Sequence, residues 1–258
     1  MSLTTALETM MARNLAKHGY PTADISWSLG YCQGDGSSFT GSLDLNVLGP
    51  RLCPEVSADI WPSISCSLAI ERLSSLRYVH EYSTRLNFDA QCIEETEAGE
   101  FGGLAQKVAL HRLVGLLEAD FVRVAQMNTS NGYKLQESYV QEEQCVWSFK
   151  TASFLVSVSK INDDDATPFL DDDLEYLDKD ISDVIEGKIS IFGSKVVISL
   201  LDADDEPSAV LAEHYTWGHC HDSDDAALRG LRRELVSEAI KVAREAYKKL
   251  LRPALKAA

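Results

Sequence analysis

Residues 24–46 read DISWSLGYCQGDGSSFTGSLDLN, and this stretch carries the clearest fold signal in the chain. Apolar and polar side chains alternate over residues 24–32 and again over residues 37–46. Alternation with a period of two is typical of a strand that buries one face. A Gly-Asp-Gly turn separates the two parts, so we predict an antiparallel hairpin that turns across Gln33–Ser37.

Segments with helical and with strand-like patterns surround this hairpin. Apolar residues recur at helical spacing in residues 3–18, 104–127, 170–186 and 224–250. Strand-like patterns cover residues 77–92, 144–160, 188–201 and 208–218. We expect residues 188–201 to form a tight hairpin that turns at Gly193-Ser194, and the proline-rich residues 50–65 to be irregular. Strands and helices mix without a regular βαβ alternation, which predicts an α+β fold with mainly antiparallel sheet and packed helices.

The chain length and an acidic stretch suggest how the fold is divided. A chain of 258 residues can form one large domain or two smaller ones. The acidic run that starts at Asp163 is a candidate boundary. We therefore predict an N-terminal subdomain over residues 1–161, which holds the QGDG hairpin, and a second subdomain over residues 162–258. The second would contain an acidic segment, a hairpin and a basic C-terminal helix; a single large domain is the alternative.

The composition indicates a globular protein of a reducing compartment. No apolar run approaches the roughly 20 residues that cross a bilayer, so we expect no membrane association. The N-terminal segment has an acid at Glu8 and resembles an amphipathic helix more than a signal peptide. The six cysteines are widely spaced and form no CxxC motif. These features predict a cytoplasmic protein with reduced cysteines.

The charge is strongly negative and unevenly spread. The formal net charge is −16, and residues 162–225 alone contain 19 acids and 3 bases. Residues 226–258 contain 9 bases and 3 acids. An acidic block repels nucleic acid and favours basic partners. A second interpretation is that the basic C-terminal helix lies against the acidic segment of the same chain.

Carboxylates within the acidic block are candidate partner-binding residues. Asp171, Asp172 and Asp173 form one cluster, and Asp204 and Asp205 belong to another. Closely spaced carboxylates can present a phosphate-like charge to a protein that binds nucleic acid. Closely spaced carboxylates can also hold Mg²⁺ or Ca²⁺, but the run Asp163–Ala166 of the same block lacks the glycine and the terminal glutamate of an EF-hand loop. The alternative is a solvated linker, and in neither case do we expect direct binding of nucleic acid.

The turn of the predicted hairpin is a second candidate contact region. Gln33 and Asp35 project polar groups, whereas Gly34 and Gly36 permit the backbone of a tight turn. The segment lacks the lysine of a phosphate-binding loop and precedes a strand, not a helix. We expect Gln33 and Asp35 to touch a partner. The alternative is an ordinary hairpin turn in which Asp35 bonds to its own backbone.

A histidine-rich segment is the one candidate for metal chemistry. His214, His219 and His221 lie near Cys220 and Asp222, and all of these residue types bind metals. Neighbouring side chains on a strand point to opposite faces, which is unfavourable for a shared ion. The three histidines are therefore weak metal candidates. No GxSxG motif or other catalytic signature is present, so we expect no cofactor and favour binding over catalysis.

The hairpin segment also resembles a known group of proteins. Ile25, Ser28, the QGDG residues 33–36, Phe39 and Gly41 match the pattern SxxxxQGDGxxFxG with its preceding strand. This pattern is similar to phage-encoded proteins that are often labelled antitoxin of a toxin–antitoxin stability system. The match covers about 20 residues. The resemblance implies a phage or mobile-element origin and supplies no catalytic residues.

Together the acidic block and this resemblance predict a binding function. We expect a phage or mobile-element protein that binds and inhibits a host nucleic-acid-binding defence complex, as anti-CRISPR and other counter-defence proteins do. Its partner would be a host protein with a basic nucleic-acid-binding surface, met in the host cytoplasm. One alternative is an antitoxin that neutralises a cognate toxin. Another is a metal-dependent hydrolase that uses the His214–Asp222 cluster.

Overall fold

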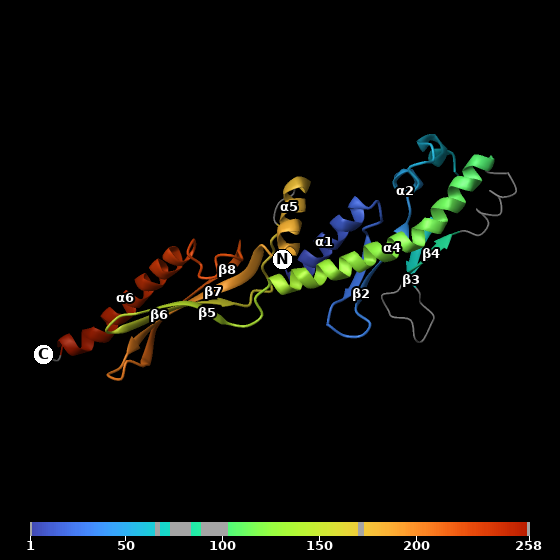
Figure 1. Cartoon of the computed structure of the whole chain (residues 1–258). Coiled ribbons are helices and arrows are strands. Elements are labelled where there is room, and N and C mark those ends of the chain that lie inside the picture. Colours follow the sequence, from blue (N-terminus) through green and yellow to red (C-terminus); the bar gives the residue numbers. More distant parts are fainter. Residues whose placement is uncertain (1, 65–67, 73–83, 89–102, 170–172, 257–258) are drawn as a thin grey trace. The chain divides into compact units, whose positions relative to one another are not determined.

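The computed structural model describes residues 2–64, 68–72, 84–88, 103–169 and 173–256. Within them the chain forms two compact units (Figure 1). The N-terminal unit comprises Leu7–Tyr133, and the C-terminal unit comprises Lys134–Ala258 together with Met1–Ala6. Each unit combines helices with an antiparallel sheet, which confirms the predicted α+β class.

The N-terminal unit contains a meander of strands. Its sheet has the order β1-β2-β3-β4, formed by β1 (Asp24–Ser28), β2 (Gly36–Ser42), β3 (Leu68–Arg72) and β4 (Thr84–Phe88). Its helices are α1 (Leu3–Lys17), α2 (Leu45–Leu52), the 3-10 helix η1 (Ala58–Ser63) and α4 (Leu104–Ser138); α1 from Leu7 and α4 up to Tyr133 belong to this unit. The predicted hairpin is confirmed, with Ile25 of β1 opposite Phe39 of β2, but its connection covers residues 29–35 and not Gln33–Ser37. β4 covers part of the strand predicted over residues 77–92; the remainder of that strand lies outside the described residues.

The core of this unit explains a helix that the sequence did not predict. Residues 50–65 were expected to be irregular, but α2 forms although it contains Pro50. The Asp44 carboxylate caps α2 by accepting a hydrogen bond from the Asn46 backbone N–H, at 2.8 Å. The buried Trp61 ring packs directly against the backbone of Gly49. Any larger residue at this position would clash, because a Cβ there would lie 2.2 Å from the ring. The cap and this close packing outweigh the unfavourable effect of a proline inside a helix.

Helix α4 is longer than its sequence pattern predicts. The run Asn128–Gly132 was expected to end it, but the helix continues to Ser138. Asn128 is buried, and Gly132 packs against the side chains of Leu29, Met11 and Leu7. A Cβ at Gly132 would lie 2.6 Å from Leu29. The glycine thus permits close packing, and contacts with residues distant in sequence keep this part helical.

The C-terminal unit is a four-stranded antiparallel sheet with two helices. The strand order is β5-β6-β7-β8, and the strands are β5 (Gln144–Lys150), β6 (Phe154–Ile161), β7 (Ile189–Leu201) and β8 (Pro207–Asp222). Helix α5 (Leu174–Ile185) connects β6 to β7, and α6 (Arg232–Lys256) follows β8. The expected division between residues 161 and 162 falls between β6 and β7, which pair along their lengths. The two units instead divide between Tyr133 and Lys134, because strands of one sheet share one core.

The predicted hairpin over residues 188–201 is wrong. These residues form the single long strand β7, which pairs with β6 on one side and β8 on the other. Gly193 lies inside this strand opposite Ile161, and Trp217 of β8 packs over it. A Cβ at Gly193 would lie 2.6 Å from the Trp217 ring. Glycine in a strand often marks such a close approach, and here it was mistaken for a turn.

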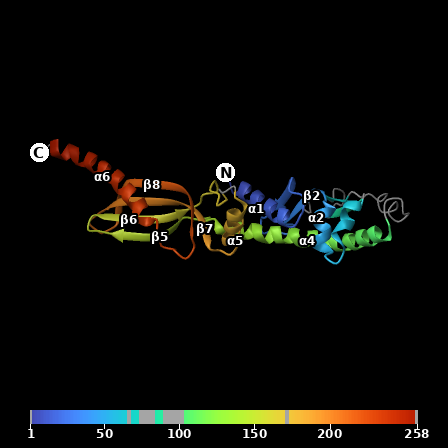
Figure 2. The same cartoon turned by 90° about the horizontal axis from the view of Figure 1, so that it is seen from above.

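Helix α6 covers part of one face of this sheet (Figure 2). Its buried residues Leu235, Ala239 and Ala243 share a core with Val196 and Ile198 of β7. The helix begins at Arg232, eight residues later than the expected start at residue 224. The intervening segment forms turns in which the Asp225 carboxylate accepts hydrogen bonds from the backbone N–H groups of Arg229 and Gly230.

None of the helices in the described residues combines the length and the apolar character that crossing a bilayer requires.

Candidate functional site

The QGDG loop is organised by the Asp35 carboxylate. It accepts hydrogen bonds from the Ser28 hydroxyl at 2.9 Å and from the backbone N–H groups of Gly30 and Cys32 at 2.8 Å each. The Tyr133 hydroxyl of α4 donates another. These donors, Tyr133 foremost, lower the pKa of Asp35. Asp35 therefore bonds within its own loop, as in the alternative interpretation of the turn, and its contact with a partner stays a prediction.

Two tyrosines and Gln33 form the solvent side of this loop. Tyr31 has a backbone φ of 55°. Its ring packs against that of Tyr133, with 4.4 Å between the two ring centroids. The hydrogen bond to Asp35 raises the pKa of Tyr133 to about 12. The Gln33 side chain and Tyr31 are exposed. Of the two predicted contact residues, Gln33 is therefore the more accessible one.

The described aspartates of the acidic block that are predicted to bind a partner lie in two different places of the structure. Asp171 and Asp172 lie outside the described residues. Asp173 caps α5, accepting a hydrogen bond from the Glu175 backbone N–H at 2.8 Å. Asp204 and Asp205 lie on the turn between β7 and β8, and both are exposed.

The turn at residues 202–206, called here the acidic turn, has a defined internal structure. The Asp202 carboxylate accepts hydrogen bonds from the backbone N–H groups of Asp204 and Glu206, at 2.9 Å each. Lys150 of β5 donates to the Asp205 backbone carbonyl at 2.8 Å. The side chain of Asp205 is 69% exposed. The acidic turn therefore presents ordered carboxylates to solvent at one end of the sheet.

The ion pairs of α6 bear on the alternative in which the basic helix neutralises the acidic block. Lys241 pairs with Glu238 at 2.5 Å, and Lys248 pairs with Glu245 at 2.7 Å. Both pairs join residues of α6 itself. These two pairs do not involve the acidic turn, but α6 packs against β8 and β7, which belong to the acidic residues 162–225.

The three histidines of the predicted metal cluster each contact different residues. His219 is within hydrogen-bond distance of the hydroxyls of Thr216 and Ser194, at 2.9 and 3.1 Å. The His221 ring contacts the Asp225 carboxylate at 2.9 Å, and His214 lies farther along β8 opposite Val196. In the described part of the chain, no three His, Cys, Asp or Glu side chains are grouped so that they could hold a metal ion.

An apolar groove lies between α6 and the sheet, and we call it the α6 groove. Its volume is about 280 Å³. Trp147 and Phe149 of β5 and Phe154 of β6 line one wall, and Ile240 and Tyr247 of α6 line the other. Phe149 is 53% exposed. The groove exists because α6 packs mainly over β8 and β7 and leaves the core face near β5 open.

Charged groups flank this groove. Arg232, Arg233, Lys241 and Arg244 line a neighbouring hollow along α6, together with Trp147. The Arg232 guanidinium lies over the Trp147 ring, 4.6 Å from its centroid. At the other side Lys150, which follows Phe149, contacts the acidic turn. Trp147 and Phe149 were not predicted as site residues, although their i, i+2 spacing indicates aromatic side chains on one face of a strand.

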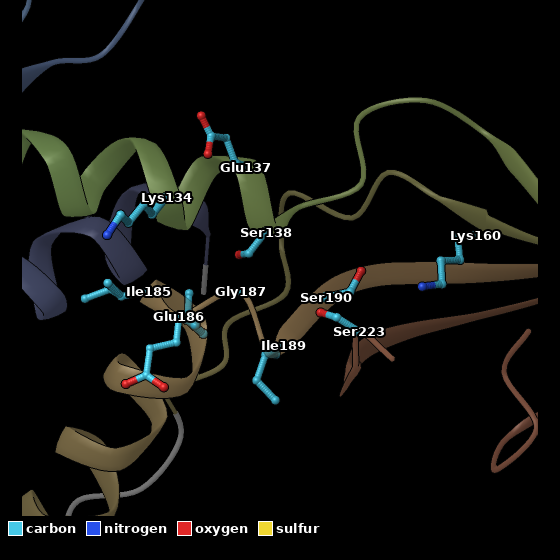
Figure 3. A pocket seen from close by; sticks show the side chains of 11 residues that line it. Lys134, Glu137, Ser138, Lys160, Ile185, Glu186, Gly187, Ile189, Ser190 and Ser223 are labelled. Atoms are coloured by element: carbon cyan, nitrogen blue, oxygen red, sulfur yellow. The ribbon is translucent and has the colours of Figure 1, made fainter. Parts of the chain in front are cut away.

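Lys160 lines one end of a second cavity of the C-terminal unit, and we call this cavity the Lys160 pocket (Figure 3). Its volume is about 440 Å³. Lys160 is only 6% exposed, and its ammonium group lies 4.6 Å from the centroid of the Phe192 ring. Burial lowers the pKa of Lys160. A lone lysine in a β-rich segment suggests a solvent-facing position, so sequence patterns gave no sign of this pocket.

Comparisons with known proteins add no family or function. No protein-family model, no curated protein and no solved structure matches this chain.

Proposed function

We propose that this protein acts by binding another protein through the α6 groove, and that the binding inhibits a nucleic-acid-binding defence complex of a host cell. The groove is the observation that supports the binding role most directly. It combines exposed aromatic residues such as Phe149 with an arginine-rich rim that includes Arg232. Aromatic and arginine side chains dominate the energetics of protein interfaces.

The edge of the sheet beside the groove offers backbone groups for the same interaction. β5 ends the strand order, and within the described residues β6 is its strand partner. An edge strand has N–H and C=O groups directed away from its sheet, and extended partner segments can pair with them. A partner strand beside β5 would place alternate side chains over Trp147 and Phe149. The proposed occupant is therefore an extended, partly apolar segment of the partner.

The acidic turn at one side of the groove favours a partner that carries basic groups opposite that turn. The acidic turn lies next to the groove through the contact of Lys150 with Asp205. Asp204 and Asp205 would face a basic nucleic-acid-binding surface and add electrostatic complementarity. The resemblance of the QGDG segment to phage-encoded proteins supports the counter-defence setting, which places the interaction in the host cytoplasm.

Capture from the lysate of a bacterial host tests this proposal. The expected result is recovery of a subunit of a nucleic-acid-binding defence complex, whose DNA binding or cleavage falls when the purified protein is added. Phe149→Asp in the groove should abolish both capture and inhibition. Val210→Asp is the matched control, because Val210 is also apolar and is 57% exposed on β8. Equal behaviour of the two variants would overturn the role of the groove.

The same capture experiment separates the alternatives. Recovery of a small toxin, with loss of its toxicity, would favour the antitoxin function over inhibition of a defence complex. Reversing the charge of Asp204 and Asp205 should weaken capture and reduce its dependence on salt. If capture of the defence complex is unchanged by this reversal, the acidic turn has no part in the interface.

A further inference from the structure

Lys160 is only 6% exposed, its ammonium nitrogen is not one of the fully buried atoms that lack a partner, and it forms no ion pair in the described part of the chain. Its ammonium group lies against the Phe192 ring, and the charge of Asp225 also acts on it. Burying an ammonium group is costly unless an anion or hydrogen-bond acceptors compensate it. The aromatic ring compensates only in part, because a cation–π contact supplies no hydrogen-bond acceptor oxygen.

Asp225, the carboxylate whose charge acts on Lys160, already accepts hydrogen bonds from other donors. One oxygen of Asp225 accepts a hydrogen bond from the Arg229 backbone N–H at 2.9 Å. The other contacts the Gly230 backbone N–H at 3.0 Å and the His221 ring at 2.9 Å. Asp225 therefore holds the turn before α6, and Lys160 keeps its capacity to donate hydrogen bonds.

Hydroxyl groups line the same part of the cavity as Lys160. Ser190 lies on β7, and Ser223 directly follows β8. Figure 3 shows both hydroxyls between the Lys160 ammonium and the end of α5. Serine hydroxyls and an ammonium group are all hydrogen-bond donors, and together they suit the oxygens of a carboxylate or phosphate.

The acidic side chains of the pocket do not neutralise Lys160. The two Glu186 oxygens contact the Ser182 hydroxyl at 2.8 Å and the Lys188 ammonium at 2.6 Å. In Figure 3 the carboxylates of Glu186 and Glu137 point away from Lys160. The pocket therefore has a cationic end at Lys160 and a mixed polar end near α5. Its volume of about 440 Å³ is larger than a bare ion needs and is within the range of small-molecule sites.

We propose that the Lys160 pocket binds a small organic molecule through an oxyanion, with the Lys160 ammonium as its anchor and the Ser190 and Ser223 hydroxyls as further donors. The oxyanion is a carboxylate or a phosphate, since both present oxygens to the same donors. This site lies apart from the residues of the α6 groove, and its ligand is a small molecule instead of a protein. The proposal therefore stands independently of the proposed protein-binding function.

Titration calorimetry of the full chain with succinate and with glycerol 3-phosphate tests the proposal. We expect saturable binding of at least one, and no binding of uncharged glycerol. The preferred anion then identifies the oxyanion as carboxylate or phosphate. Lys160→Met should weaken binding about tenfold or more, the effect of losing a charge-assisted hydrogen bond. Lys179→Met is the control, because Lys179 on α5 has the same charge and its side chain is 72% exposed.

A second variant keeps the test valid if Lys160→Met fails to fold. Ser190→Ala combined with Ser223→Ala preserves the cation and should weaken anion binding while leaving the circular dichroism spectrum unchanged. If neither anion binds saturably to the unaltered protein, the proposal is overturned. Equal losses in the Lys160→Met and Lys179→Met variants would also overturn it, because the effect would then come from net charge alone.

Discussion

Asp35 of the N-terminal unit accepts hydrogen bonds from its own loop and from Tyr133, whereas Lys160 of the C-terminal unit is buried against an aromatic ring. The N-terminal unit uses its polar groups internally in another place as well. The Asp120 carboxylate accepts hydrogen bonds from Tyr20 at 2.6 Å and from Arg51 at 2.5 Å. The C-terminal unit instead has an open apolar groove and a cavity lined by Lys160, which forms no ion pair in the described residues. Both proposed binding sites, the α6 groove and the Lys160 pocket, lie in the second unit.

The largest expected effect compares two phenylalanines, one from each unit. Phe39 is fully buried, so Phe39→Ala should destabilise the N-terminal unit by about 3–5 kcal/mol through lost burial and a cavity. Phe149 is 53% exposed, and Phe149→Ala should cost at most about 1 kcal/mol. Hydrogen exchange followed by mass spectrometry resolves the two units. A large loss of protection in the Phe149→Ala protein would mean that the groove is part of the core.

The next effect concerns the internal ion pair of the N-terminal unit. Asp120→Ala leaves Arg51 partly buried and without its carboxylate, and should destabilise the unit by about 2 kcal/mol. Urea unfolding measures the loss. Glu118→Ala is the control, since Glu118 is an exposed acid of the same helix. Equal stability of the two variants would show that the Asp120 network contributes nothing beyond surface charge.

The same network predicts a dependence of stability on pH. Burial alone would raise the pKa of Asp120, but hydrogen bonds from Arg51, Tyr20 and Arg123 outweigh it and lower the pKa to about 2. The unfolded value is about 4, so the ionised carboxylate stabilises the fold above that pH, and the contribution is lost as the pH falls from about 4 to 2. Unfolding midpoints of the unaltered and Asp120→Asn proteins should converge in this range. A constant difference between them down to pH 2 would contradict the assignment.

The smallest expected effect is a titration shift in the QGDG loop. Asp35→Asn removes the charge that raises the pKa of Tyr133 to about 12, so this pKa should fall toward its ordinary value of about 10. Difference absorbance of the tyrosinate on alkaline titration measures the change, with Tyr133→Phe identifying the signal. An unchanged Tyr133 titration would mean that Asp35 does not organise the loop.

Sequence patterns located the elements whose signals are local. The alternation over residues 24–46 correctly predicted the β1–β2 hairpin, and the helical spacing in residues 170–186 predicted α5. The same reasoning selected Asp35, whose side chain proved to hold the loop. Lys160 was not predicted as a site residue, because a single lysine in a strand has no distinctive spacing. Phe149 was not predicted either, although its i, i+2 spacing from Trp147 is a local signal.

The sequence by itself determined the α+β class and the first hairpin, because period-2 and period-3.6 patterns and a Gly-Asp-Gly turn act between near neighbours. Only the tertiary structure decided the features that depend on distant residues. Trp217 makes Gly193 part of a long strand, and Trp61 packs where Gly49 has no side chain. Pairing of β6 with β7 moved the division between the units, and the incomplete cover that α6 gives the sheet created the groove. Burial is a property of the packed sheet and helices, so it is not encoded at any one of these positions alone.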